Sequence, residues 1–175
     1  GAFVNTFGDS GSNEGNFKGP AGLALSANGN IYVADPDNKR VQAFNSDGIF
    51  LFAVGPQVGT LALRNPVSVR VDSGKNLHIL DADLKKVIVT SSNGKFLRVW
   101  DNSGDLQEPV AMAYDGRGYF FVLDRGEFRV KIFDEDGTYV SSFFSRGLGE
   151  RELMDPRYLD IADNKLYIAD YASGK

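Results

Sequence analysis

The stretch from Pro20 to Gly55, PAGLALSANGNIYVADPDNKRVQAFNSDGIFLFAVG, contains four short apolar segments separated by turn-forming residues. The segments are GLALS, NIYVAD, RVQAF and FLFAVG, and the separators are ANG, DPDNK and NSDG. Short apolar runs bounded by Gly, Asn, Asp and Pro are typical of β-strands joined by tight turns. The stretch therefore predicts a sheet of four antiparallel strands.

The same unit recurs along the chain at intervals of roughly 45 residues, a period typical of propeller blades and solenoid turns. In each copy the second strand ends in aspartate, and in the complete copies a basic residue followed by valine opens the third strand. We delimit units at residues 20–55, 66–101 and 109–144, and an incomplete unit at 156–175. Residues 1–8, which contain AFVNTFG, resemble the last strand of a preceding unit.

The pattern P-x-G-L/I-A, then G-N-x-Y-V-A-D, then N-x-R-V-Q-x-F and D-G is similar to the NHL repeat family. The first unit matches best, with Asn38, Arg40, Val41, Gln42 and Phe44 in place. The second departs from the pattern at Leu80, Lys86 and Ser91, and the third at residues 125–127. The resemblance covers nearly the whole chain.

This resemblance implies an all-β fold, a β-propeller of four-stranded antiparallel NHL-type blades, six in most family members. NIYVAD and YFFVLD are apolar at successive positions, as expected for sheets packed between two neighbours. The chain covers about four blades. We therefore expect an arc of a six-bladed ring, completed by other sequence or by self-association through open blade edges.

Composition restricts the function classes. The chain has no cysteine and a single histidine, and its net charge of −4 disfavours a purely electrostatic grip on nucleic acid. Its longest apolar run, at residues 49–54, is far shorter than a membrane helix requires, so we expect no membrane partner. No phosphate-binding loop or calcium-loop series is present, and we expect no metal and no cofactor.

The aspartates that end the second strands have two possible roles, a structural one and a catalytic one. An aspartate at a turn can accept hydrogen bonds from the backbone amides just after it, and its recurrence in every unit favours this structural role over catalysis. The four structural turn residues are Asp35, Asp81, Asp124 and Asp170.

Catalysis is the weaker hypothesis. A metal-dependent propeller lyase or lactonase would need several histidines or carboxylates converging on the central channel. His78 lies inside a strand, where a packed role is the simpler interpretation. Arg70 and Asp160 occupy positions of the first strands where small residues predominate, and we interpret them as solvated in the channel. We therefore assign no catalytic residue and predict that the chain is not an enzyme.

The function we predict is a scaffold or interaction module that binds a protein partner. The contact surface is expected to include the turns between second and third strands and the long loops, because loops vary most and carry binding. RNA binding through a basic loop face is the alternative. The candidate contact residues are Arg40, Arg64, Lys86, Arg125, Arg129 and Tyr158.

Overall fold

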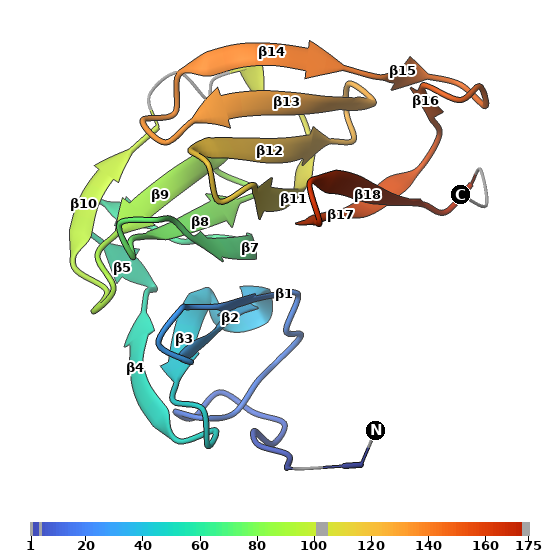
Figure 1. Cartoon of the computed structure of the whole chain (residues 1–175). Helices are drawn as coiled ribbons and strands as arrows, with labels where there is room; N and C mark the ends of the chain where they lie inside the picture. Colours follow the sequence, from blue (N-terminus) through green and yellow to red (C-terminus); the bar gives the residue numbers. More distant parts are fainter. Residues whose placement is uncertain (1, 4, 101–104, 173–175) are drawn as a thin grey trace.

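A computed structural model describes residues 2–3, 5–100 and 105–172 of the chain. Three four-stranded antiparallel sheets and one two-stranded sheet follow one another along an arc (Figure 1). The predicted unit limits at residues 1, 101 and 175 lie outside the described residues. The fold class predicted from the sequence is confirmed: this is an all-β, partial propeller.

Each complete sheet is built from consecutive strands. The first sheet contains β1 (Gly22–Leu25), β2 (Ile31–Asp35), β3 (Arg40–Phe44) and β4 (Phe50–Val54). The second contains β7 (Pro66–Val71), β8 (Leu77–Asp81), β9 (Lys86–Thr90) and β10 (Phe96–Val99). The third contains β11 (Pro109–Tyr114), β12 (Tyr119–Asp124), β13 (Arg129–Asp134) and β14 (Tyr139–Phe143), and the fourth β17 (Pro156–Ala162) and β18 (Lys165–Asp170).

Short elements occupy the connections. A 3₁₀ turn, η1 (Pro36–Asn38), follows β2 and ends at Lys39 in the left-handed conformation. The connection between the first two sheets holds the small hairpin β5 (Gln57–Val58) and β6 (Leu61–Ala62). The connection to the fourth sheet holds the parallel pair β15 (Ser145–Arg146) and β16 (Glu152–Leu153).

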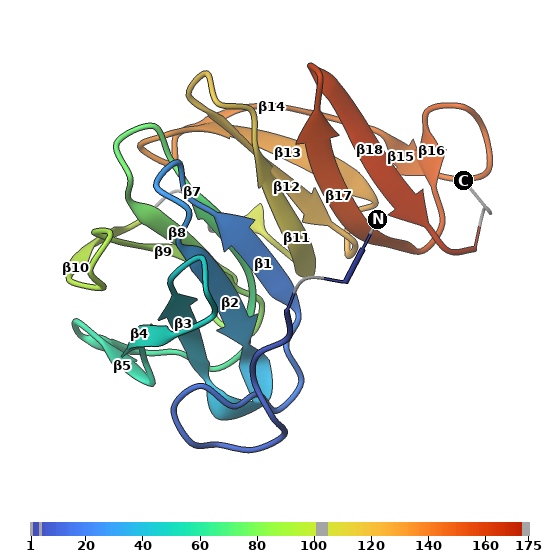
Figure 2. The same ribbon diagram turned by 60° about the horizontal axis from the view of Figure 1, so that its bottom comes forward.

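The inner strands β1, β7, β11 and β17 contact one another in order, so the sheets pack face to face around a common axis (Figure 2). Crowding near this axis explains the small residues of the first strands. A Cβ atom at Gly22 would lie 2.7 Å from the carbonyl oxygen of Val67 and 2.8 Å from the Cα atom of Ser68. The sheets can approach this closely only because no side chain is present at residue 22.

Packing between neighbours explains why the strands are apolar on both faces. Every residue of β8 is buried, because β8 lies in a sheet with neighbours on both sides. In β18 buried or half-buried residues alternate with exposed ones, the pattern of a strand covered on one face only. Three core clusters fill the three spaces between successive sheets.

The segment expected to form the last strand of a preceding blade differs from the prediction. Residues 2–3 and 5–8 are in no strand, and Phe7 instead packs on Phe44 with ring centroids 4.9 Å apart. A fourth strand pairs with the third strand of its own sheet. No described residue forms a third strand next to residues 2–8. The segment instead contacts the first sheet through the side chain of Phe7.

Candidate binding surface

Two sets of connections meet on one side of the arc, which we call the loop face. It consists of the turns β2–β3, β8–β9 and β12–β13, residue 171 after β18, and the loops that lead into β1, β7, β11 and β17. The loops into the first strands and the turns after the second strands share one side because successive strands run antiparallel.

The recurrent aspartates hold this face together. All four are buried and at most 2% exposed. Asp81 accepts hydrogen bonds from the backbone amides of Arg64 and Asn65, at 2.7 and 3.1 Å, and from that of Leu84 at 3.0 Å. The other three accept amides from the same loop position: Asp35 from Lys18, Asp124 from Gln107 and Glu108, and Asp170 from Met154 and Asp155.

These donors differ from those that the sequence suggested. Of the amides named above, that of Leu84 follows its aspartate. The others lie 15 to 17 residues earlier, in the loop that enters the same sheet. Each carboxylate therefore ties the entry loop of its sheet to the end of the second strand.

Arg40 belongs to this scaffold and is not a free surface charge. Its Nε atom lies 3.3 Å from Asp35 Oδ2, and its Nη2 atom donates to the carbonyl oxygens of Asn13 and Asn16 at 2.8 Å each. The Gln42 side chain contacts the same loop: its Nε2 atom donates to the carbonyl oxygen of Asn16, and its Oε1 atom accepts from the backbone amide of Gly15. Arg40 thus holds the loop into β1 against the first sheet.

Arg125 is likewise engaged with neighbouring acids. Its guanidinium donates to the Glu108 carboxylate and lies 3.8 Å from Asp155, in the loop that enters the fourth sheet. The hydrogen bond between Arg125 and Glu108 lowers the pKa of the Glu108 carboxyl below its usual value and raises the pKa of Arg125. These contacts join the third sheet to the connection that follows it.

Sequence reasoning missed Lys131, a buried cation on β13. Its Nζ atom lies 3.1 Å from Asp124 and 3.1 Å from Glu127, and it also donates to the carbonyl oxygen of Asp105. Lys131 takes the position that Gln42 and Ile88 hold in the other sheets. The sequence could have indicated this residue, because Lys131 is charged at a repeat position where the other two complete units have uncharged residues.

Three other candidates keep their charges free of ion pairs within the part of the chain that the structure describes. Arg64 is exposed, and Lys86 is half-buried opposite Asp81 in the strand register. Arg129 is exposed, and its Nη1 atom donates to the Ser142 hydroxyl at 3.1 Å. These three residues lie on the loop face or at its edge.

Tyr158 lies elsewhere, on the inner strand β17. With Leu23, Arg70 and Asp160 it lines a hollow toward the axis of the arc. Arg70 is buried, contrary to the expectation of a solvated side chain: its Nη1 atom donates to the carbonyl oxygens of Leu23 and Val69. Its Nη2 atom lies 3.7 Å from Asp160, so this contact connects the second and fourth sheets.

The opposite side of the arc contains the histidine. His78 is fully buried, its Nε2 atom lies 2.9 Å from Asp72 Oδ2, and its ring packs on Phe120 at 4.2 Å between centroids. Burial lowers the pKa of His78, although the Asp72 carboxylate opposes this shift. Burial opposes ionisation of Asp72, but hydrogen bonds from His78 and Asn76 outweigh it and lower the pKa of Asp72.

This burial predicts a pH dependence of stability. Because the pKa of His78 is lowered in the folded protein, the unfolded chain binds more protons between that pKa and the usual value of about 6.5. The free energy of unfolding should therefore fall as the pH drops below about 6.5. Urea denaturation at a series of pH values between about 5 and 8 measures this change.

The control is His78→Phe. His78 is the only histidine in the chain, so this variant should lose the dependence near pH 6. An equal slope in both proteins would contradict the assignment.

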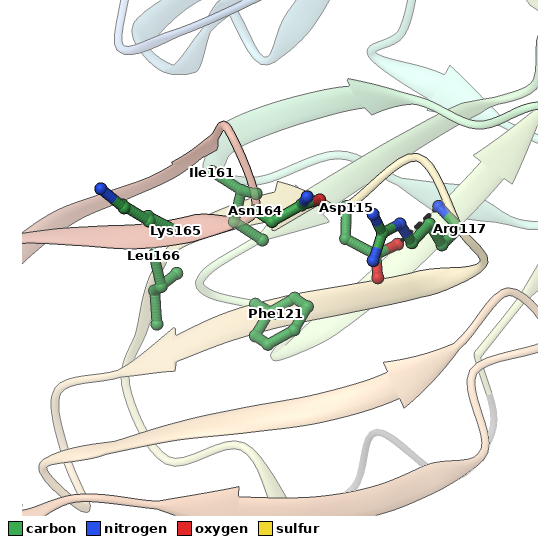
Figure 3. A pocket seen from close by; sticks show the side chains of 7 residues that line it. All are labelled: Asp115, Arg117, Phe121, Ile161, Asn164, Lys165 and Leu166. Atoms are coloured by element: carbon green, nitrogen blue, oxygen red, sulfur yellow. Dashed lines mark hydrogen bonds between the residues drawn. The ribbon is translucent and has the colours of Figure 1, made fainter.

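A small pocket of about 170 Å³ lies between the third and fourth sheets on the same side as His78 (Figure 3). It is lined by Asp115, Arg117, Phe121, Ile161, Asn164, Lys165 and Leu166. The Asp115 carboxylate accepts the backbone amides of Arg117 and Tyr119 at 2.7 and 3.0 Å, so it serves the turn. The other residues that line the pocket do not include a nucleophile next to a general base.

Across residues 2–3, 5–100 and 105–172, no three His, Asp or Glu side chains are grouped to hold a metal ion. Within the same ranges, no helix has the length and apolar character needed to cross a bilayer.

Comparison with known proteins supports the repeat. Residues 17–44 match the model of the NHL repeat. Over 140 residues the chain is 31% identical to Protein brain tumor of Drosophila melanogaster, covering 78% of this chain and 13% of that protein. It is 33% identical over 140 residues to the B-box type zinc finger protein ncl-1 of Caenorhabditis elegans, covering 78% of this chain and 16% of that protein.

The fold has relatives among solved structures. The structure of a streptogramin B lyase aligns with a TM-score of 0.69 at 15% identity, covering 95% of this chain and 51% of the lyase. At that identity the likeness concerns the fold alone. The repeat pattern, the successive four-stranded sheets and the sequence matches together show that this chain belongs to the NHL repeat family.

Proposed function

We propose that this chain is a non-catalytic module that recognises a protein partner through its loop face. The observation that carries the proposal is that three cations of this face are already paired with acidic neighbours. Arg40, Arg125 and Lys131 form ion pairs with acidic neighbours. Clustered free lysines and arginines are what phosphate binding requires, whereas a face of mixed and compensated charge suits a protein.

Exposed apolar side chains on the same face support a protein partner. Leu148, in the loop that enters the fourth sheet, is 66% exposed, and Tyr171, just after β18, is 85% exposed. Tyrosine and arginine are enriched at the energetic centres of protein interfaces. Arg64 and Arg129, which form no ion pair with a described residue, add exposed guanidinium groups to the same face.

The hydrogen bonds of the aspartates make this face rigid. A buried carboxylate fixes the described end of each entry loop, next to the first strand, so this part of the backbone is held in place before a partner arrives. A preorganised loop loses less conformational entropy on binding than a flexible one. The scaffold residues thereby support recognition without contacting the partner.

The test reverses the free charges together in Arg64→Glu/Lys86→Glu/Arg129→Glu. We expect partner affinity to fall at least about tenfold, because three favourable contacts become repulsive. A matched control, Lys75→Glu/Lys95→Glu/Arg117→Glu, makes the same change at exposed residues on the opposite side. Arg40 is left unchanged, because its replacement would release the loop into β1.

Affinity capture with quantitative mass spectrometry identifies proteins retained by the wild type, and each captured protein is then titrated against both triple variants. Equal affinity for the two variants would reject the loop face as the contact surface. A filter-binding titration with mixed RNA at physiological salt runs in parallel. Submicromolar RNA binding that weakens steeply with salt would replace the protein-binding proposal with RNA binding through Arg64, Lys86 and Arg129.

A further inference from the structure

The interface between the second and third sheets, which we call the 2–3 junction, contains the single histidine of the chain. His78 belongs to β8 of the second sheet, and its ring packs on the Phe120 ring of β12 in the third sheet. The indole ring of Trp100 lies 5.6 Å from the imidazole ring. Because His78 is 0% exposed, these aromatic rings separate its imidazole from water.

The two imidazole nitrogens have different surroundings. Nε2 lies 2.9 Å from Asp72 Oδ2, and the Asp72 carboxylate also accepts the backbone amide and the side-chain amide of Asn76 at 2.7 and 2.9 Å. No described residue forms a hydrogen bond with Nδ1. A protonated imidazole carries an N–H group on both nitrogens. Protonation of His78 would therefore bury a positive charge and a donor without an acceptor, and both are unfavourable away from water.

Further polar contacts cross the 2–3 junction beside this histidine. The Tyr114 hydroxyl donates to the Glu135 carboxylate, and Ser73 Oγ lies 3.1 Å from the same carboxylate. Glu135, in the turn between β13 and β14, is thereby bonded to the turn between β7 and β8. Arg98 of β10 donates to the carbonyl oxygen of Glu135, and its Nη2 atom lies 3.4 Å from Asp136 Oδ1.

These charges act on His78 in opposite directions. Burial is the largest effect and lowers the pKa of His78, and the positive charge of Arg98 adds to this shift. The carboxylates of Asp72 and Glu135 oppose it. In the closed junction, burial outweighs both carboxylates, so the neutral imidazole is favoured.

The interface between the first and second sheets, the 1–2 junction, lacks such groups. Tyr32 holds in β2 the position that His78 holds in β8, three residues before the last aspartate of the strand. The Tyr32 hydroxyl donates to the carbonyl oxygen of Ser92 at 3.5 Å, a contact between neutral groups. No described carboxylate or imidazole forms a hydrogen bond or an ion pair between these two sheets. Phe121 and Tyr167 hold the position in the third and fourth sheets.

We propose that the 2–3 junction opens locally in acid: protonation of His78 separates the second sheet from the third, while the 1–2 junction stays closed. Separation lets water reach Nδ1 and the imidazolium charge, which the rings of Phe120 and Trp100 exclude in the closed state. Each pH unit below about 6.5 should multiply the open population by up to about tenfold, because the opened histidine binds a proton that the closed one does not. This inference is independent of the loop-face proposal, and it locates within the molecule the loss of stability expected in acid.

Because the chain has no cysteine, one introduced cysteine can report on each junction. Val122→Cys in β12 faces the 2–3 junction, and the matched Val69→Cys in β7 faces the 1–2 junction; both valines are 0% exposed. The rate of reaction with a small thiol reagent, divided by that of free cysteine at the same pH, gives the open population. Between about pH 7.5 and about pH 5, this ratio should rise for Val122→Cys at least about tenfold, towards a limit of about thirtyfold. At the lower pH, Val69→Cys should react at least about tenfold more slowly than Val122→Cys.

Three further variants in the Val122→Cys background test the cause. His78→Gln removes the titrating ring and keeps a donor for Asp72, so the rise in acid should disappear. His78→Phe, which keeps a ring against Phe120, should give the same result and serves if the glutamine variant does not fold. Glu135→Gln removes the other carboxylate of the junction and should retain the rise, because His78 is still present.

The proposal would be overturned by a constant ratio for Val122→Cys, by a rise that persists without His78, or by a rise that disappears in Glu135→Gln. Equal reaction of Val69→Cys and Val122→Cys in acid would also overturn it, because both cysteines would then be exposed by global unfolding. Repeating the measurement in low urea separates the two events: local opening exposes little surface and should depend weakly on urea, whereas global unfolding depends on it steeply.

Discussion

Replacing Asp81 with alanine is expected to lower the free energy of unfolding by about 3 to 5 kcal/mol. The carboxylate is fully buried and accepts the backbone amides of Arg64, Asn65 and Leu84. Without it, these amides lose their acceptor, and a buried donor left without a partner costs about 1 to 3 kcal/mol. Urea denaturation followed by circular dichroism measures the change, provided that the slope with denaturant stays constant.

Two variants test the reason for this loss. Asp81→Asn keeps one acceptor oxygen and should lose less stability than Asp81→Ala. Asp83→Ala removes an exposed carboxylate two residues away, whose bond to the Asn65 side chain is also exposed, and should change stability by about 0.5 kcal/mol or less. If Asp81→Ala were as stable as Asp83→Ala, the anchoring role would be wrong.

Phe120→Ala is expected to cost about 3 to 5 kcal/mol. Phe120 is fully buried at the centre of an aromatic cluster between the second and third sheets, with ring centroids of His78, Tyr114 and Trp100 within 5.3 Å. Removing the ring would leave a cavity that three neighbouring rings from two sheets cannot fill without separating those sheets. The substitution should therefore destabilise both the second and the third sheet, which are expected to unfold cooperatively.

Differential scanning calorimetry and urea denaturation measure this loss. Phe120→Leu keeps most of the volume and should cost less than Phe120→Ala. Phe3→Ala removes a ring that is 81% exposed and should change stability by about 0.5 kcal/mol or less. A cost for Phe120→Ala no greater than that for Phe3→Ala would contradict the packing between the sheets.

The strands were predictable from the sequence because their signals are local. Turn dipeptides such as Asp47-Gly48 and Asn93-Gly94 lie between apolar runs in every complete unit, and the glycines have positive φ in the structure. The strand pairs follow in chain order, so the local pattern also determines which strands are neighbours. Residues 2–8 carry the same apolar pattern but are in no strand where described, because pairing needs a neighbour that local sequence does not supply.

The candidate site was less predictable, because free and engaged charges look alike in a sequence. Arg40 and Arg129 occupy the same repeat position, yet Arg40 is bound by Asp35 and two carbonyl groups while Arg129 is exposed. Tyr158 was expected on the contact surface formed by the turns and the long loops. In the structure it faces the axis of the arc with Arg70 and Asp160.

The sequence by itself determined the repeat, the four-stranded unit, the family and the recurrence of an aspartate at the end of each second strand. These features depend on the order of residues within about 45 positions, which the chain displays directly. The tertiary structure alone decided which amides those aspartates bind, which cations remain free, and that Leu166 and Ile168 are only partly covered. These features depend on contacts across loops and between sheets, because a side chain's partners and exposure are set by whichever distant segments pack against it.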